Sequence, residues 1–279
     1  MKHAAKKIVV LALVALVCTA FTACSAPASD IVAPDADKLF YGELVYNTIL
    51  TDNSGAQTTY PTTYTVERKN DEIIISSSGA LEEQSMHSSS ILYAGGTNGE
   101  TSDKASVSRA FMPKKITMNF ENTKTPKANV DINAEHSLEN QEIKLAVSQF
   151  ENENDSEPVT KNYTIPTSAQ YYDSDSLLWM ISALPLEVGY SKNITISSSN
   201  RDQLQSMNIS VKEEMKYIIN KDSETQKEFD CYVVIIKPNT PFTNFATYVY
   251  YAKDYHNMVV AIKQETTSFE LTTFTEKSE

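Results

Sequence analysis

Short runs of β-branched and aromatic residues recur along the chain and predict β-strands. Clear examples are LFYGELVYNTIL from Leu39, EIIISSS from Glu72 and CYVVIIK from Cys231. Stretches such as TDNSGAQ, KND and GGTNGE lie between the runs, and their Asn, Asp, Gly and Ser residues favour the tight turns that end strands. The pattern predicts a mainly β fold, an antiparallel β-roll or half-barrel meander with one short helix.

The run ATYVYYAK has the period of two that is typical of a strand with two different faces. Tyr248 and Tyr250 share one face, while Val249 and Tyr251 share the other. Tyrosine on both faces indicates that one side packs and the other stays partly solvated. The run CYVVIIK shows no alternation, so we expect a strand that is covered on both faces.

One segment, near residues 174–184, has helical spacing. Its polar start, DSDS, supplies N-cap candidates, and Pro185 ends it. Apolar side chains form one stripe along it: Leu177, Leu178, Ile181 and Leu184. Trp179, the only tryptophan, lies off the centre of this stripe. It therefore either covers the rim of the core or edges a ligand groove.

Two distant segments share nearly the same pattern. Ile73–Met86 reads IIISSSGALEEQSM and Ile194–Met207 reads ITISSSNRDQLQSM, at a constant offset of 121 residues. Each copy predicts a strand, a polar turn and the start of the next strand. The likeness indicates either a duplication that produced two related β halves or chance similarity between serine-rich strands.

An acidic stretch, ENENDSEPVT, interrupts the strand pattern. Its composition favours a linker or long loop, because such a segment buries too little apolar surface to order itself. We therefore divide the folded part into an N-terminal β half, 38–150, an acidic linker or loop, 151–162, and a C-terminal β-roll half that contains the helix, 163–279.

The N-terminus has the pattern of an exported precursor. Residues 1–23 combine a basic start with an apolar run of about 14 residues, which is short for a membrane span. The sequence FTACS resembles the lipobox of bacterial lipoproteins, which implies lipid attachment at Cys24 and a place on the extracytoplasmic side of the cell membrane or outer membrane. Cleavage by ordinary signal peptidase after Ala20 or Ala26 is the alternative. Residues 24–37 are small, polar and proline-bearing, and predict a flexible tether.

The net charge and the cysteine content limit the kinds of binding partner and disulfide that we expect. The formal net charge is −12, and loss of the three lysines in residues 1–23 lowers it to about −15. A domain this acidic, without a Lys/Arg cluster, is unsuited to nucleic acid. After processing, Cys231 is the one cysteine besides Cys24, so we expect no intramolecular disulfide. Its apolar surroundings in the sequence indicate a core residue.

The sequence contains no G-x-S-x-G, H-E-x-x-H, paired-cysteine or phosphate-binding glycine motif. The histidines beyond the signal segment, His87, His136 and His256, lie in polar stretches, and we expect them to be solvated. Asp173 and Asp175 fit helix capping better than calcium binding. We therefore expect no enzymatic activity, cofactor or metal. The alternative is a hydrolase with an unrecognised carboxylate site.

The C-terminal half carries a second resemblance. The helix ends in LPLEVG from Leu184, the strand start EFDC precedes the run from Cys231, and KDYHN from Lys253 turns into MVVAI. Over about residues 170–275 the chain resembles exported bacterial proteins of the domain-of-unknown-function family numbered 3108. The resemblance implies an antiparallel β-roll or half-barrel around a helix and implies no activity. A more distant likeness is to lipoprotein-carrier folds that hold acyl chains.

These features favour a membrane-anchored, non-catalytic binding module for a hydrophobic ligand or an envelope protein. We expect a groove beside the helix, with Trp179, Tyr248 and Tyr250 as ligand-binding residues. The alternative is a structural or assembly protein that presents a sheet edge or loop surface to an envelope complex. A continuous apolar cavity favours the carrier, and a filled core favours the assembly role.

Overall fold

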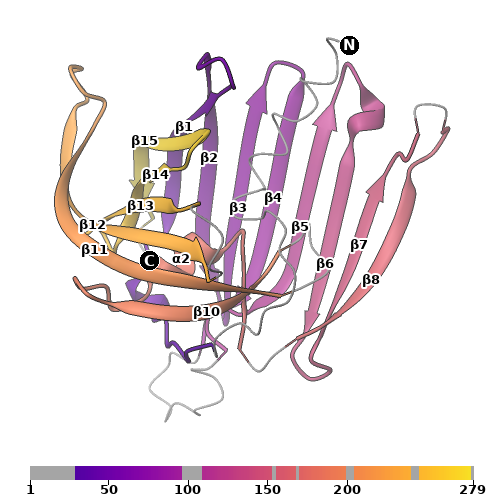
Figure 1. Cartoon of the computed structure of the whole chain (residues 1–279), viewed down its shortest axis with the longest axis horizontal. Coiled ribbons are helices and arrows are strands. Elements are labelled where there is room, and N and C mark those ends of the chain that lie inside the picture. Colours follow the sequence, from indigo (N-terminus) through magenta and orange to yellow (C-terminus); the bar gives the residue numbers. More distant parts are fainter. Residues whose placement is uncertain are drawn as a thin grey trace.

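The computed structural model describes residues 29–95, 109–152, 155–167, 170–198, 204–239 and 245–277. Within these ranges, fifteen strands form one sheet and one α-helix lies against it (Figure 1). Over the same ranges, no helix combines the length and apolar character needed to cross a membrane. Cys24 lies outside the described residues.

The chain forms two runs of strands separated by the helix. The N-terminal run comprises β1 (Gly42–Thr51), β2 (Gln57–Lys69), β3 (Glu72–Leu81), β4 (Gln84–Tyr93), β5 (Pro113–Asn122), β6 (Val130–Ser137), β7 (Glu142–Gln149) and β8 (Val159–Pro166). The short strand β9 (Tyr172–Asp173) and the helix α2 (Leu177–Ser182) follow. The C-terminal run comprises β10 (Ser191–Ser197), β11 (Gln205–Ile219), β12 (Lys227–Pro238), β13 (Thr247–Ala252), β14 (Met258–Lys263) and β15 (Thr267–Glu276). Two 3-10 helices, η3 (Ala36–Lys38) and η4 (Pro126–Ala128), complete the described elements.

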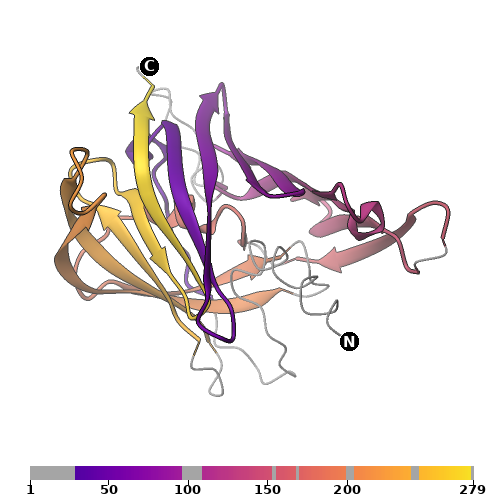
Figure 2. The same cartoon turned by 90° about the horizontal axis from the view of Figure 1, so that it is seen from above.

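Both runs meet at one seam. β1 pairs antiparallel with β2 on one side and with β15 on the other, so the sheet order is β8 to β1, then β15 back to β9. Neighbouring strands are antiparallel except for β9 and β10. The prediction of a mainly β antiparallel meander with one short helix is confirmed. Figure 2 shows that the sheet is not flat, because β10–β12 curl away from β2–β4.

Glycine is required at this seam. Gly42 begins β1 with a φ of +152°, and a Cβ built there would lie 2.1 Å from the carbonyl oxygen of Thr275 in β15. Any side chain at residue 42 would therefore push the two strands apart. The first and last strands approach this closely because the sequence places Gly at the first residue of β1.

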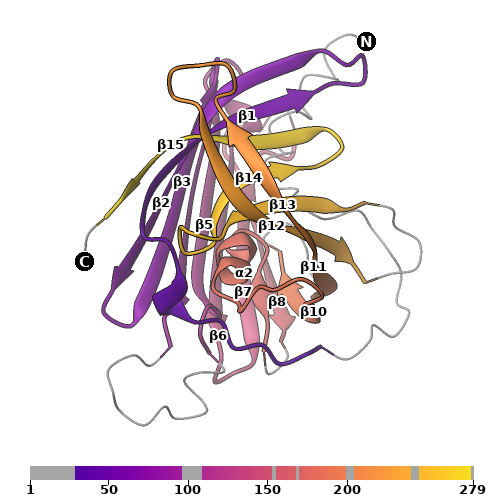
Figure 3. The ribbon, with the colours of Figure 1, turned by 90° about the vertical axis from the view of Figure 1, so that its left-hand side faces the viewer.

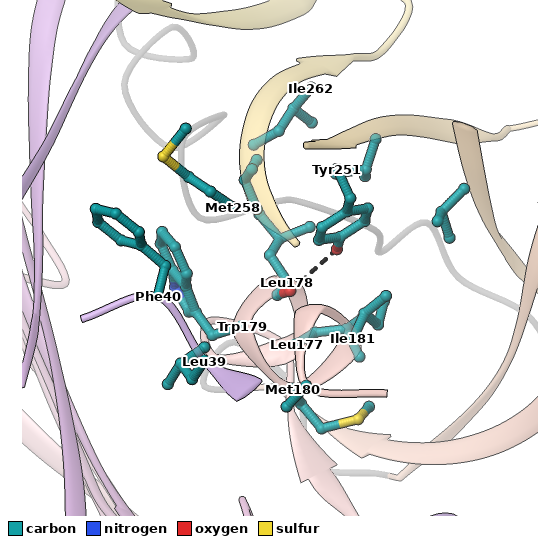
Figure 4. Close-up of a cluster of buried hydrophobic side chains, with 14 of the residues drawn as sticks. Leu39, Phe40, Leu177, Leu178, Trp179, Met180, Ile181, Tyr251, Met258 and Ile262 are labelled. Atoms are coloured by element: carbon teal, nitrogen blue, oxygen red, sulfur yellow. Dashed lines mark hydrogen bonds between the residues drawn. The ribbon is translucent and has the colours of Figure 1, made fainter. Parts of the chain in front are cut away.

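Helix α2 lies inside the curve of the sheet and joins the two halves (Figure 3). All six of its residues are buried. The Trp179 ring lies 5.5 Å from the Tyr64 ring of β2, measured between centroids. From the other half, the Tyr251 hydroxyl of β13 donates a hydrogen bond to the Leu178 carbonyl at 3.0 Å (Figure 4). The helix thus contributes apolar surface to both halves.

Trp179 is not at the rim of the core. It is 2% exposed and belongs to the large apolar cluster that surrounds α2. The sheet curls far enough that the side of the helix away from the predicted stripe also meets a strand. That curvature is a tertiary feature, so the helical periodicity alone gave no sign of it.

Strand β12 is covered on both faces, as its unbroken apolar run predicted. Val234 lies on one face and Cys231 and Val233 lie on the other, and each is at most 3% exposed. The second face is covered by the far end of the β11–β12 hairpin, which bends back toward β15. There the Asn220 side-chain amide donates to the Thr272 carbonyl at 2.9 Å.

The described part of residues 24–37 is packed against the domain, which differs from the predicted flexible tether. Val32 is 4% exposed and joins the main core. The Asp30 N–H donates to the Asn193 carbonyl of β10 at 2.6 Å. This segment orders because Val32 and Ala36 reach apolar surface that only the folded sheet provides.

The acidic segment 151–162 lies within the N-terminal half. It includes the turn between β7 and β8 and the start of β8, and the two strands pair from Gln149 and Val159 to Glu142 and Pro166. The N-terminal run of strands therefore extends to Pro166, and the chain passes to the other half after β8.

The two similar segments form hairpins with different registers. Ile73–Met86 lies in β3 and β4, and Ile194–Met207 lies in β10 and β11. Ile73 pairs with Leu92, whereas Ile194 pairs with Met207. At the same offset β2 would fall on residues 178–190, which include most of α2 and no strand, so the likeness does not extend to the strand before this unit.

Substitution of Gly42 by alanine should destabilise the protein through the seam. We expect G42A to lower the free energy of unfolding by about 3 kcal/mol, because the added Cβ meets backbone and the φ is strained. Chemical denaturation measures this difference. The matched control is G55A, since Gly55 also has a positive φ, +82°, but a Cβ there meets nothing within 4 Å. Equal losses in both variants would show that the close approach to β15 does not matter.

Candidate binding site

The structure does not bring the three predicted ligand residues together. Trp179 lies in the core inside the curve of the sheet, whereas Tyr248 and Tyr250 lie on the opposite face of β13 from Tyr251, which contacts α2. Tyr248 is 39% exposed. Tyr250 instead packs on the Tyr217 ring of β11, with 4.7 Å between centroids. The three side chains therefore do not line a common groove beside the helix.

Strand β8 is an open edge of the sheet. It is eight residues long, it ends the strand order, and seven of its residues are exposed. Its sequence, VTKNYTIP, places Val159, Lys161, Tyr163 and Ile165 on one side and Thr160, Asn162, Thr164 and Pro166 on the other. The opposite edge is β9, whose two residues, Tyr172 and Asp173, are each 1% exposed. The described sheet thus covers one edge and leaves the other accessible.

The two sides of β8 differ in character. Val159 and Tyr163, each 40% exposed, share a side with the buried Ile165 and with Lys161, which pairs with Glu151. The other side is polar, and there the Thr160 and Ser148 hydroxyls are 3.0 Å apart. β8 pairs with β7 along its whole length without a bulge, so its free edge is a regular strand.

A second apolar cluster lies on one face of β5–β8. Its buried members are Met112, Ile116, Met118, Ile132, Ala134, Ile143, Leu145, Ile165 and Tyr171. Among the described residues, Tyr171 and Leu204 are the members that follow β8 in the chain. This cluster is separate from the core around α2.

His136 lies on the same face of β6 as this cluster, and it is 9% exposed. Its expected solvation is therefore wrong, because strand alternation turns it to the side of Ile132 and Ala134. Its Nδ1 lies 3.1 Å from the Tyr171 hydroxyl, and the two rings stack at 5.8 Å. Burial lowers the pKa of His136 to about 4, so the imidazole is neutral near pH 7. Nε2 has no hydrogen-bond partner within the described residues.

The other two histidines are exposed. His87 lies on the outer face of β4 and lines a groove of about 410 Å³ over β4–β7, together with polar side chains such as Asn119 and Asp131. His256 lies in the β13–β14 turn, with Nε2 3.8 Å from a Glu276 carboxylate oxygen.

The aspartates before the helix serve the backbone. Asp173 is 1% exposed, and its carboxylate accepts hydrogen bonds from the Asp175 N–H at 2.9 Å and the Ser197 hydroxyl at 3.0 Å. Burial raises the pKa of Asp173 to about 6. The N-cap of α2 is Ser176, which makes no side-chain capping bond. Asp173 thus ties β9 to β10 and shapes the turn that precedes the helix.

Within the described ranges, no group of three or more His, Cys, Asp and Glu residues is arranged to hold a metal ion. Cys231 is buried, which confirms its prediction as a core residue.

Strand β8 is not among the strands predicted from sequence. The acidic stretch before it predicts a linker that extends to residue 162, which includes the first residues of β8. The available signal was its content of β-branched and aromatic residues, with Val159, Tyr163 and Ile165 on one side. An edge position cannot be recognised from sequence, because it depends on the absence of a neighbour in the folded sheet.

Comparison with known proteins gives one result. Residues 97–268 match the family described as "Protein of unknown function (DUF3108)", from before β5 into β15. No curated protein and no solved structure matches the chain. The match spans more than half of the 279 residues and includes the helix and the C-terminal strands on which the resemblance rested. The chain therefore belongs to the DUF3108 family.

Proposed function

We propose that this protein is an extracytoplasmic lipoprotein, anchored through a lipid at Cys24, that binds an envelope protein by strand addition to β8 and has no catalytic activity. The observation that carries the proposal is the open edge, an eight-residue strand with seven exposed residues at the end of the sheet. Complete burial of α2 supports an assembly role over carriage of a ligand beside the helix.

An open regular edge attracts other strands. In an antiparallel ladder, alternate residues of the edge strand direct N–H and C=O groups away from the neighbour, where a further strand can bind them. Proteins commonly blunt such edges with lysine or proline. In β8 the proline, Pro166, stands at the last residue, and the lysine, Lys161, lies between Val159 and Tyr163 on the same side of the strand. Lys161 pairs with Glu151 beside the β7–β8 turn at 2.6 Å, so its charge is already partnered within the chain. The strand therefore has no proline before its last residue, and its one lysine is ion-paired.

The side chains of β8 define the partner. An added strand would place alternate side chains beside Val159 and Tyr163 and the others beside Thr160 and Asn162. The complementary segment is an extended chain that alternates apolar and polar residues, as in other complexes formed by strand addition. Such a segment gains backbone hydrogen bonds from the edge and specificity from the apolar side.

Lysine at Val159 and Tyr163 should prevent this association. With a photoreactive residue at Asn162, we expect one envelope protein to crosslink to the chain in intact cells. The double variant V159K/Y163K should reduce that crosslink at least about tenfold, because two desolvated charges oppose strand addition. Both positions are 40% exposed, so the free energy of unfolding should change little.

The matched control for this prediction is Y248K, since Tyr248 is a similarly exposed strand residue, 39%, far from β8 in the sheet order. It should leave the crosslink unchanged. A crosslink to a second copy of the chain would assign the edge to self-association and contradict a heterologous partner. A crosslink that survives V159K/Y163K would exclude β8 as the binding edge.

The anchor is tested by Cys24→Ala, which removes the thiol expected to carry the lipid. We expect the variant to move from the membrane fraction to the soluble fraction after cell fractionation, because a lipid anchor is the proposed membrane attachment. Cys18→Ala, in the apolar segment, is the matched control and should remain in the membrane fraction. Membrane retention of the Cys24→Ala variant would contradict lipidation at this residue.

A second candidate function is binding of a hydrophobic ligand on the β5–β8 face. The observation that favours it is His136, whose Nε2 lacks a described partner although the side chain is buried among apolar residues. Buried polar atoms are normally hydrogen-bonded. A neutral imidazole at this position suits an amphiphilic ligand whose polar group hydrogen-bonds to Nε2 while its apolar part contacts the face.

His136→Leu should change the pH dependence of stability. The pKa of His136 is about 4 when folded and about 6.5 when unfolded, so its contribution is present above pH 6.5 and is lost as the pH falls toward 4. Between pH 7 and pH 5 we expect the wild type to lose about 2 kcal/mol more unfolding free energy than H136L. The effect of Asp173 has the opposite sign, because its pKa is raised to about 6, but it is present in both proteins.

Chemical denaturation at each pH measures this difference, and the exposed His87→Leu is the matched control. Equal pH profiles for H136L and wild type would show that His136 is not held neutral. Native mass spectrometry of the same intact proteins tests the ligand. Solvent-extractable mass on wild type and H87L that is absent from H136L supports the second candidate, and bare protein in all three contradicts it.

A further inference from the structure

The β11–β12 hairpin closes against β15 and leaves a groove beside the contact. Two hydrogen bonds fix the closure, from the Asn220 side-chain amide to the Thr272 carbonyl at 2.9 Å and from the Tyr217 hydroxyl to a Glu270 carboxylate oxygen at 2.8 Å. The groove has a volume of about 540 Å³ and is lined by residues of β1, β11, β14 and β15 and of the hairpin turn. This volume is within the range of small-molecule sites.

Positive charge gathers in this groove. Three lysines line it, Lys216, Lys221 and Lys263, against one carboxylate, Glu270. The chain as a whole has a formal net charge of −12. Lysine side chains gathered in one groove of such an acidic protein raise the local concentration of small anions where their charge is not already paired.

Two of the three lysines retain free charge. Lys216 forms an ion pair with Glu228. Within the described part of the chain, the side chains of Lys221 and Lys263 form no ion pair and no hydrogen bond. The Lys263 ammonium instead lies 5.1 Å from the centroid of the Tyr217 ring and 5.6 Å from that of Tyr250. Ring contacts leave its three N–H donors available for an oxyanion.

The groove also contains hydrogen-bonding groups that suit hydroxyls on a ligand. One Glu270 carboxylate oxygen accepts the Tyr217 hydroxyl, and a carboxylate has capacity for further donors. Asn47, which pairs with Glu270 across the β1–β15 seam, adds a side-chain amide to the lining. A ligand here can therefore place an anionic group at the lysines and hydroxyl donors at Glu270.

We propose that this groove binds a small hydroxylated anion of the sugar-phosphate class, with Lys221 and Lys263 on the anionic group and Glu270 on a hydroxyl. The site is independent of the proposed β8 association, because it is formed by β1 and the C-terminal strands. Tyr250, expected from sequence as a ligand residue, supports the site indirectly through its ring contacts with Tyr217 and with the Lys263 ammonium.

Titration of the intact protein with glucose 6-phosphate, inorganic phosphate and glucose tests the proposal. Isothermal calorimetry should show binding of glucose 6-phosphate, weaker binding of phosphate and none of glucose. K263Q and K221Q should each weaken glucose 6-phosphate binding about tenfold, since each removes a charge-assisted hydrogen bond. Raising NaCl from about 50 to about 500 mM should weaken it further.

The matched control is K144Q, on β7 and outside the groove, which should bind glucose 6-phosphate as the wild type does. An equal loss in K144Q would reduce the effect to overall charge and overturn the site. Equal affinity for phosphate and glucose 6-phosphate would overturn the role of Glu270. Absence of binding by both anions would overturn the proposal, and it would leave the crosslinking result at β8 unaffected.

Discussion

The antiparallel pairing of β1 with β15 is the contact on which the rest of the structure depends. It joins residues more than 200 positions apart, from Gly42 and Glu276 to Leu50 and Thr267. Closing so long a loop costs conformational entropy, which the chain recovers through the ladder, the neighbouring strand pairs and the shared core. The close approach at Gly42 shows how tightly the two strands meet. Because β1 and β15 pair with each other, the N-terminal strands add to the sheet on one side of this pair and the C-terminal strands add on the other side.

The two runs of strands end differently, and only the N-terminal run ends in an exposed edge strand. The C-terminal strands curl around α2 until the sheet ends in the short, buried β9. Tyr251 and Trp179 hold the helix from the two halves, so the curl encloses a filled core. The N-terminal strands extend away from the helix, and among the described strands their last one, β8, has no neighbour beyond it. The sheet is larger than one short helix can cover. The strands that do not contact α2 therefore end in an edge that the helix leaves exposed.

Polar side chains lie in two surroundings that their sequence context did not predict. His136 enters an apolar face because residues on that side of β6 alternate inward, and burial then keeps it neutral. The lysines of the hairpin groove converge because the β11–β12 hairpin bends over β13 to reach β15, where Asn220 holds it. Histidine and lysine are common residue types. In these two places the folded surroundings change the charge of the histidine and bring the lysines into one groove. The DUF3108 match includes the helix and the C-terminal strands, so this part of the fold belongs to the family. A family of unknown function assigns no activity, and any function has to be argued from local sites such as these.

The residue pattern is enough to predict the elements and their local faces. β-branched runs and turn residues gave the mainly β meander, the apolar stripe before Pro185 gave the helix, and the unbroken run from Cys231 gave a strand covered on both sides. These features depend on neighbours within a few residues, which periodicity records. Four features follow from the tertiary arrangement alone: Trp179 is enclosed, Val32 joins the core, β8 is an edge, and Lys221 and Lys263 line one groove. Each of these features depends on which distant segment packs against the residue. Local residue patterns do not predict contacts between distant segments.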